Sequence, residues 1–79
     1  MKANGVLGVP ETKVLTALVR HHDRFVRMGE LTAATGLTEP AIAKAIQRVR
    51  TFYGPNAIDA RRRSGYRIHE RVWQSFREE

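Results

Sequence analysis

The sequence predicts a mainly α-helical domain with a small β-hairpin near its C-terminus, and three observations lead to this prediction. Apolar residues recur at helical spacing between residues 14 and 49. A polar turn at Asp23 and Arg24, and then Gly36, divide that region into three helical stretches. After residue 56, short segments of strand character replace the helical pattern. A chain of 79 residues is expected to form one domain, because it is too short for two hydrophobic cores.

The composition excludes several classes of protein. Cys is absent, which excludes disulfide scaffolds, zinc fingers, iron–sulfur ligation and thiol nucleophiles. The apolar stretches are too short to cross a bilayer, and residues 1–9 lack the apolar region of a secretory signal. We therefore expect a cytoplasmic protein with no membrane partner.

An enzyme is not expected. The sequence contains no Gly-rich phosphate loop, no paired carboxylates on a shared face and no nucleophile with a nearby base. His21 and His22 are adjacent, so on a helix their side chains diverge by about 100° and cannot chelate a metal from one face. We expect neither a cofactor nor a metal.

Positive charge is concentrated in one part of the chain. Fourteen Lys and Arg residues oppose eight Asp and Glu residues, which gives a net charge of +6. Eight of the basic residues lie between residues 44 and 71, where only Asp59 and Glu70 oppose them, so this stretch alone carries 8 − 2 = +6. A local basic block on a neutral scaffold is typical of a protein that binds a polyanion.

The N-terminal part is predicted to be an arm followed by one helix. Residues 1–9 are rich in small residues and Gly and are expected to form a flexible arm before a domain at 10–79. The first helix is expected to begin near Pro10, whose fixed φ suits a first helical turn. Its apolar stripe consists of Val14, Leu15, Leu18 and Val19, and a short extended segment is expected at 25–27.

A second helix is predicted over 28–35, with Leu31 and Ala34 facing inward. Gly36 follows it at a position where a positive φ is usually required. Leu37 then provides an apolar plug between this helix and the next one.

The third helix is predicted over about 38–53. Thr38 has the side chain of an N-cap residue, and Glu39 and Pro40 favour the first turn. The inward positions at helical spacing are Ile42, Ile46 and Val49. Gly54 to Asn56 end the helix.

A β-hairpin is predicted over 58–68, with a basic tip formed by Arg62, Arg63 and Ser64 before Gly65. A final helix, about 70–77, has three large apolar residues on one side. We expect this side either to close the core against the first helix, which we favour, or to form a dimer interface. These residues are Val72, Trp73 and Phe76.

Residues 28–53 have the spacing of a helix-turn-helix: a short helix, Gly in the turn, an apolar plug and a capped longer helix. Residues 30–38, ELTAATGLT, resemble the helix-turn-helix of bacterial winged regulators, often ELAxxxGLS. Residues 58–68, IDARRRSGYRI, are similar to the wing of OmpR/PhoB-type regulators, roughly IxTVRGxGYRL. Arg63 stands where the wing pattern has Gly. The resemblance covers about residues 10–69.

This resemblance implies a winged helix-turn-helix fold with a three-helix core, a C-terminal wing and a short extra C-terminal helix. It also implies sequence-specific binding to double-stranded DNA by a small prokaryotic transcription regulator. The recognition helix, about 38–53, would enter the major groove, and the wing would contact the adjacent minor groove or backbone.

The outward positions of the third helix are candidate DNA contacts. Gln47 has the groups to pair with adenine, and Lys44 and Arg48 to contact guanine or phosphate. Glu39 either accepts from cytosine or, as we favour, stabilises the helix N-terminus. The candidates on this helix are Thr38, Glu39, Pro40, Ala43, Lys44, Gln47, Arg48 and Thr51. The candidates on the wing are Arg61, Arg62, Arg63 and Arg67.

One alternative uses the same fold without DNA. A winged-helix domain also serves as a protein–protein interaction module in a larger nucleoprotein or inhibitory complex, since function depends on the site and not on the fold. The concentration of charge on the third helix and hairpin favours DNA over this alternative. Both a homodimer and a larger regulatory protein remain open as partners.

Overall fold

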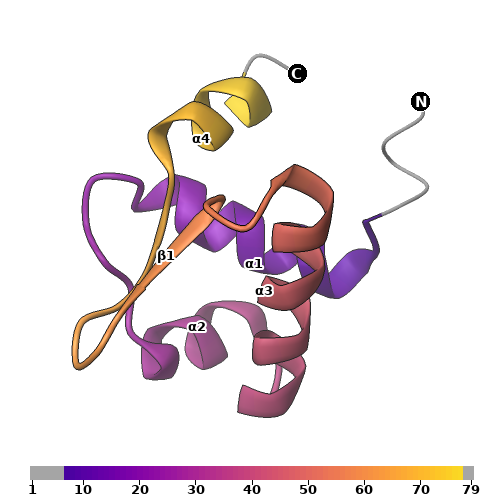
Figure 1. The fold of residues 1–79 in the computed structure, drawn as a ribbon. Helices are drawn as coiled ribbons and strands as arrows, with labels where there is room; N and C mark the ends of the chain where they lie inside the picture. The colour runs from indigo at the N-terminus through magenta and orange to yellow at the C-terminus, as the bar shows by residue number, and fades with distance from the viewer. Residues whose placement is uncertain (1–6, 78–79) are drawn as a thin grey trace.

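A computed structural model describes the backbone of residues 7–77 and the side chains of residues 7–75. This part of the chain forms four helices and one two-stranded antiparallel hairpin (Figure 1). The predicted mainly helical chain with a C-terminal hairpin is therefore confirmed. The elements in order are α1 (Val9–Arg20), α2 (Met28–Thr35), α3 (Glu39–Tyr53), β1 (Ile58–Arg61), β2 (Gly65–Ile68) and α4 (Glu70–Arg77).

The beginning of α1 differs from the predicted boundary by one residue. Gly8 is the N-cap residue, so Val9 already belongs to the helix and Pro10 lies in its first turn. Leu7 is half-buried and packs against the core. Residues 1–6 of the predicted flexible arm lie outside the described residues.

The hydrophobic core lies between the first three helices and the base of the hairpin. Val14, Leu15 and Leu18 on α1 are completely buried, as the predicted stripe requires. Burial of each such side chain contributes roughly 1.5–3 kcal/mol to folding, so these contacts fix how the helices pack. The other core residues are Ala17, Val26, Leu31, Ile42, Ala45, Ile46, Val49, Ala57, Ile58, Ile68 and Val72.

The inward face of α2 differs from the prediction at one residue. Ala34 is exposed, whereas Thr35 is buried beside Leu31. Leu31 and Thr35 are four residues apart and therefore share a face of the helix. The Thr35 hydroxyl donates to the Leu31 carbonyl at 2.6 Å and accepts from the Leu37 N–H at 3.1 Å. These two bonds satisfy the buried hydroxyl, so the expectation that Ala34 faces inward was wrong.

The turn between α2 and α3 follows the predicted pattern. Gly36 has a φ of 76°, a left-handed conformation that favours glycine, and its N–H bonds to the Thr32 carbonyl at 2.8 Å. Leu37 is half-buried and packs against the core. The Thr38 hydroxyl accepts from the Ala41 N–H at 3.3 Å and caps α3. The short turn therefore holds α3 in a fixed orientation against α2.

The hairpin is joined to the helices by Val26. β1 and β2 pair with Ile58 opposite Ile68 and Arg61 opposite Gly65. On its other edge, β2 forms an antiparallel bridge between Tyr66 and Val26, with N–O distances of 2.6 and 2.8 Å. The predicted extended segment at 25–27 thus adds a third short strand-like piece to the hairpin.

The C-terminal helix lies against the core at its first turn. Val72 is buried, and the ring of Trp73 stacks on His22, just after α1, with 3.9 Å between the ring centroids. The favoured expectation that this helix packs back toward α1 agrees with these contacts. The side chain of Phe76 lies outside the described residues. None of the helices in the described range 7–77 is long and apolar enough to cross a membrane.

Acid is expected to weaken the turn between α1 and α2. Both Glu30 oxygens accept from Arg24, at 3.0 and 2.9 Å, and Oε1 also accepts from the Arg27 N–H. The Arg24 hydrogen bonds and then the backbone bond lower the pKa of Glu30 from 4.5 to about 2. A lowered carboxyl pKa stabilises the fold above pH 4.5, and this contribution disappears as the pH falls toward 2.

NMR titration of the Glu30 side-chain carboxyl carbon checks this prediction. We expect a midpoint near pH 2 in the native chain and a midpoint closer to the ordinary value in Arg24→Ala. An identical midpoint in the two proteins would show that Arg24 does not cause the shift.

Candidate nucleic-acid interface

The outward face of α3 is exposed along its whole length. All eight residues that the sequence analysis places there are exposed, whereas Ile42, Ala45, Ile46 and Val49 are buried on the opposite side. Successive residues of an α-helix are about 100° apart around its axis. Four of the exposed residues therefore lie within an arc of roughly 60° directly opposite the buried side: Pro40, Lys44, Gln47 and Thr51. These four side chains form the centre of the exposed face, and Ala43 lies beside them.

The first turn of α3 combines a cap with a negative charge. The Thr38 hydroxyl is used as an acceptor by the Ala41 N–H. Glu39 is exposed in the first turn, where a carboxylate interacts favourably with the positive end of the helix dipole. Thr38 therefore caps the helix, and the stabilising role of Glu39 stays a prediction.

Arg48 lies at the edge of the outward face that is next to α1. Its Nε is 3.6 Å from Oε2 of Glu11, a residue in the first turn of α1. The other carboxylate oxygen of Glu11 accepts from the Gly8 N–H at 2.8 Å. The Glu11 side chain is only 5% exposed, whereas that of Arg48 is 63% exposed. Arg48 thus partly offsets a buried carboxylate, which leaves Lys44 as the cation at the centre of the outward face.

Arg50 belongs to the basic block but faces the hairpin. Its Nε and Nη2 both donate to the Ile58 carbonyl, at 3.2 and 2.7 Å. These two hydrogen bonds connect α3 to the first residue of β1 and help to fix the position of the hairpin relative to α3. The sequence analysis counted Arg50 only as a positive charge. The available signal was its place directly after Val49, which the helical spacing predicts to face inward.

The hairpin presents its four candidate arginines to solvent. Arg61, Arg62, Arg63 and Arg67 are all exposed. Arg63 has a φ of 72°, a left-handed conformation at the position where the wing pattern has Gly. Between the hairpin turn and the start of α2 lies an open hollow of about 450 Å³, which Arg27 and the arginines of residues 61–63 line together with Met28 and Tyr66.

The ring of Phe25 lies close to two of these arginines, and the sequence analysis did not identify this contact. The Arg61 guanidinium carbon lies 5.0 Å from the centroid of the Phe25 ring, and that of Arg67 lies 5.8 Å from it. Arg67 is opposite Asp59 in the hairpin, and Arg61 is two residues after Asp59 on the same strand. Arg61 and Arg67 therefore lie on the same face of the hairpin. A guanidinium within about 6 Å of a ring centroid is attracted to the ring, and its N–H groups can still donate to another molecule. The signal was the place of Phe25 directly before Val26.

The hairpin turn and the first turn of α3 both lie at the lower edge of the view in Figure 1, with α2 between them. Two carboxylates belong to the same elements: Glu39 begins α3, and Asp59 is opposite Arg67 in the hairpin. Among the described residues, the ion pairs are Arg24 with Glu30 and Arg48 with Glu11, so neither Lys44 nor any hairpin arginine forms one. Lys44 and the four hairpin arginines outnumber these two carboxylates, so this part of the surface carries a positive charge.

In the described part of the chain, no three His, Asp or Glu side chains come together in a way that could hold a metal ion. No protein-family model matches the chain, and the comparisons with curated proteins and with solved structures give no match.

Proposed function

We propose that the chain is a small transcription regulator, of the winged helix-turn-helix kind, that binds double-stranded DNA in a sequence-specific manner. In this proposal α3 enters the major groove with Lys44 and Gln47 facing base edges, and the hairpin contacts the adjacent minor groove or backbone. It is a prokaryotic, cytoplasmic protein associated with the nucleoid. The observation that carries the proposal is an exposed polar helix face together with a hairpin that bears four exposed arginines, both at one edge of the molecule with α2 between them (Figure 1).

The chemistry of α3 supports insertion into the major groove. Pro40 and Ala43 are small, so they permit close approach of the helix to base edges or to a thymine methyl group. Gln47 has one donor and one acceptor for the adenine edge, and Lys44 donates to guanine or to phosphate. The helix N-terminus, which bears Thr38 and Glu39, is the part that meets base edges in this docking mode.

The hairpin supports a second, less specific contact. Arg62 and Arg63 lie in its turn, and Arg61 and Arg67 are held by Phe25. Arginines in such a position are suited to phosphates and to a narrow minor groove. Phosphate contacts fix the position of a protein on the duplex, whereas base contacts carry the specificity.

A salt titration of binding to random-sequence duplex DNA tests the proposal. Four to six phosphate contacts predict a log–log slope of roughly −4 to −5 in fluorescence anisotropy, because each contact releases condensed counterions. Absence of binding at low salt, by a chain whose circular dichroism is that of a folded protein, would contradict the proposal.

Gln47→Ala is expected to change base preference. Once a preferred site has been selected from random duplexes, the variant should lose discrimination at one base pair by roughly 5- to 100-fold. Its affinity for random duplex should change little, because the glutamine carries no charge. Competition binding with a panel of single-base-substituted sites measures both quantities. An equal loss on preferred and random duplexes would show that Gln47 does not read a base.

A further inference from the structure

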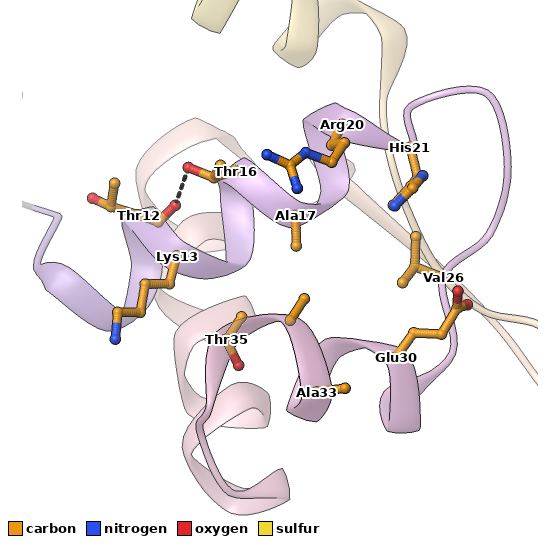
Figure 2. Close-up of a pocket in the computed structure, with 11 residues that line it drawn as sticks. Thr12, Lys13, Thr16, Ala17, Arg20, His21, Val26, Glu30, Ala33 and Thr35 are labelled. Carbon is orange, nitrogen blue, oxygen red and sulfur yellow. Dashed lines mark hydrogen bonds between the residues drawn. The ribbon is translucent and has the colours of Figure 1, made fainter.

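A groove runs between α1 and α2, and it uses neither the outward face of α3 nor the hairpin arginines. It has a volume of about 640 Å³, within the range of roughly 300–1,000 Å³ that is typical of binding pockets. Figure 2 shows Ala17 pointing from α1 toward α2 and Lys13 on the N-terminal part of α1, with the Arg20 side chain over the last turn of α1 and turned back toward Thr16. We define the α1–α2 groove by Lys13, Thr16, Ala17, Arg20, Ala33 and Ala34.

The middle of the groove is apolar and shallow because its side chains are small. Ala33 and Ala34 on α2 are exposed and line one side of the groove, and the largely buried methyl group of Ala17 lines the α1 side. Small side chains allow another backbone to approach closely, as helices that pack at 8–10 Å between their axes require. The exposed Ala34, which was expected in the core, therefore leaves room for a partner.

The charge at the rim is positive. Lys13, Thr16 and Arg20 lie three and four residues apart, so they form one row along α1. The acidic residue of the lining, Glu30, already accepts two hydrogen bonds from Arg24. Lys13 and Arg20 form no ion pair among the described residues. The unopposed charge of the groove is therefore that of two cations.

The spacing of these cations fits a helix. Seven residues along an α-helix correspond to about 10 Å, so Lys13 and Arg20 match two acidic residues placed seven apart on a second helix. A row of apolar side chains on the same helix would lie over the alanines, in the way amphipathic helices bind hydrophobic grooves. A small molecule is less well matched, because the groove is open and shallow, whereas a site for a small molecule encloses most of its ligand.

We propose that the α1–α2 groove is the docking site for an acidic amphipathic helix of a partner protein. The partner would bind on a surface separate from α3 and the hairpin, so that a chain bound to DNA can still hold it. This proposal does not depend on the proposed DNA binding, because it uses other residues.

The probe is a synthetic amphipathic helix with leucines along one face and glutamates on both sides of them. In an NMR titration of the full-length labelled chain, this peptide should shift amide signals of residues 12–20 and 33–35. A twin peptide with lysines in place of the glutamates should bind more weakly. The double variant Lys13→Glu, Arg20→Glu should lose about tenfold in affinity for the acidic peptide and gain affinity for the basic one.

The matched control reverses two charges elsewhere, in Lys44→Glu, Arg62→Glu. It should bind the acidic peptide at the groove with unchanged affinity. Peptide shifts that centre on α3 or the hairpin would overturn the proposal, as would equal losses in the two double variants. Two further results would overturn the proposal. If duplex DNA shifts the amide signals of the groove residues, DNA occupies the groove. If these signals move with protein concentration alone, a second copy of the chain occupies it.

Discussion

Gly65→Ala is expected to lower the free energy of unfolding by about 3 kcal/mol or more. Gly65 begins β2 with a φ of 107°, which L side chains rarely adopt. A Cβ at this position would overlap the Val26 carbonyl oxygen and would lie 2.8 Å from the Arg27 Cα, and both atoms belong to the backbone. The hairpin would therefore have to move away from Val26 and lose the bridge to Tyr66.

Thermal unfolding followed by circular dichroism measures this effect, and a decrease of about 15 °C in the melting temperature is expected. Two other glycines provide controls. Gly54 has a φ of 119° but open space around it, so Gly54→Ala isolates the conformational cost, about 1–3 kcal/mol. Gly29 lies in the first turn of α2, and a Cβ added there would meet no other atom within 4 Å, so Gly29→Ala should stabilise the fold by up to about 1 kcal/mol. If Gly65→Ala costs no more than Gly54→Ala, the close approach to Val26 has no energetic consequence.

The double variant Arg62→Ala, Arg63→Gly is expected to bind every duplex roughly 30-fold more weakly at moderate salt, with a salt slope about 2 units shallower. Both arginines lie in the hairpin turn and are exposed, so each is assigned one phosphate contact under the proposed function. Specificity should persist, because the helix face that bears Gln47 is untouched. Anisotropy titrations on preferred and random duplexes at several salt concentrations provide the measurement.

This variant should be no less stable than the native chain. Arg63 adopts a φ of 72°, which costs an L residue about 1 kcal/mol and a glycine almost nothing. Arg62 is exposed, so its replacement should change stability by less than about 0.5 kcal/mol. The control Lys13→Ala, Arg20→Ala removes the same charge from α1. A comparable loss of DNA binding in this control would mean that net charge, and not the hairpin, determines affinity.

Local chemistry predicted most of the secondary structure. Gly36 and Thr38 mark the end of α2 and the start of α3 through φ preference and capping, and neither depends on distant residues. The face of α2 was harder to predict. A helix of only eight residues has a short apolar pattern, so the packing of α1 decided that Thr35 and not Ala34 is buried.

The candidate interface was predicted where it follows from helical period and missed where it depends on contacts between distant segments. The exposure of Lys44 and Gln47 follows from the burial of Ile42, Ile46 and Val49. The contacts of Arg48 with Glu11 and of Arg61 with Phe25 join residues far apart in the chain. No spacing rule relates such residues, because their separation is set by how α1 and the hairpin pack.

The sequence by itself determined where the helices and the hairpin form, which side of α3 is apolar, and that the excess charge belongs to α3 and the segment that follows it. These properties depend on neighbouring residues, through helical period, caps and glycine. Only the tertiary structure decided which cations remain unpaired, that Phe25 holds two arginines, and that a groove with a basic rim lies between α1 and α2. Each of these depends on the distance between segments brought together by the core, and that distance is not encoded in any local pattern.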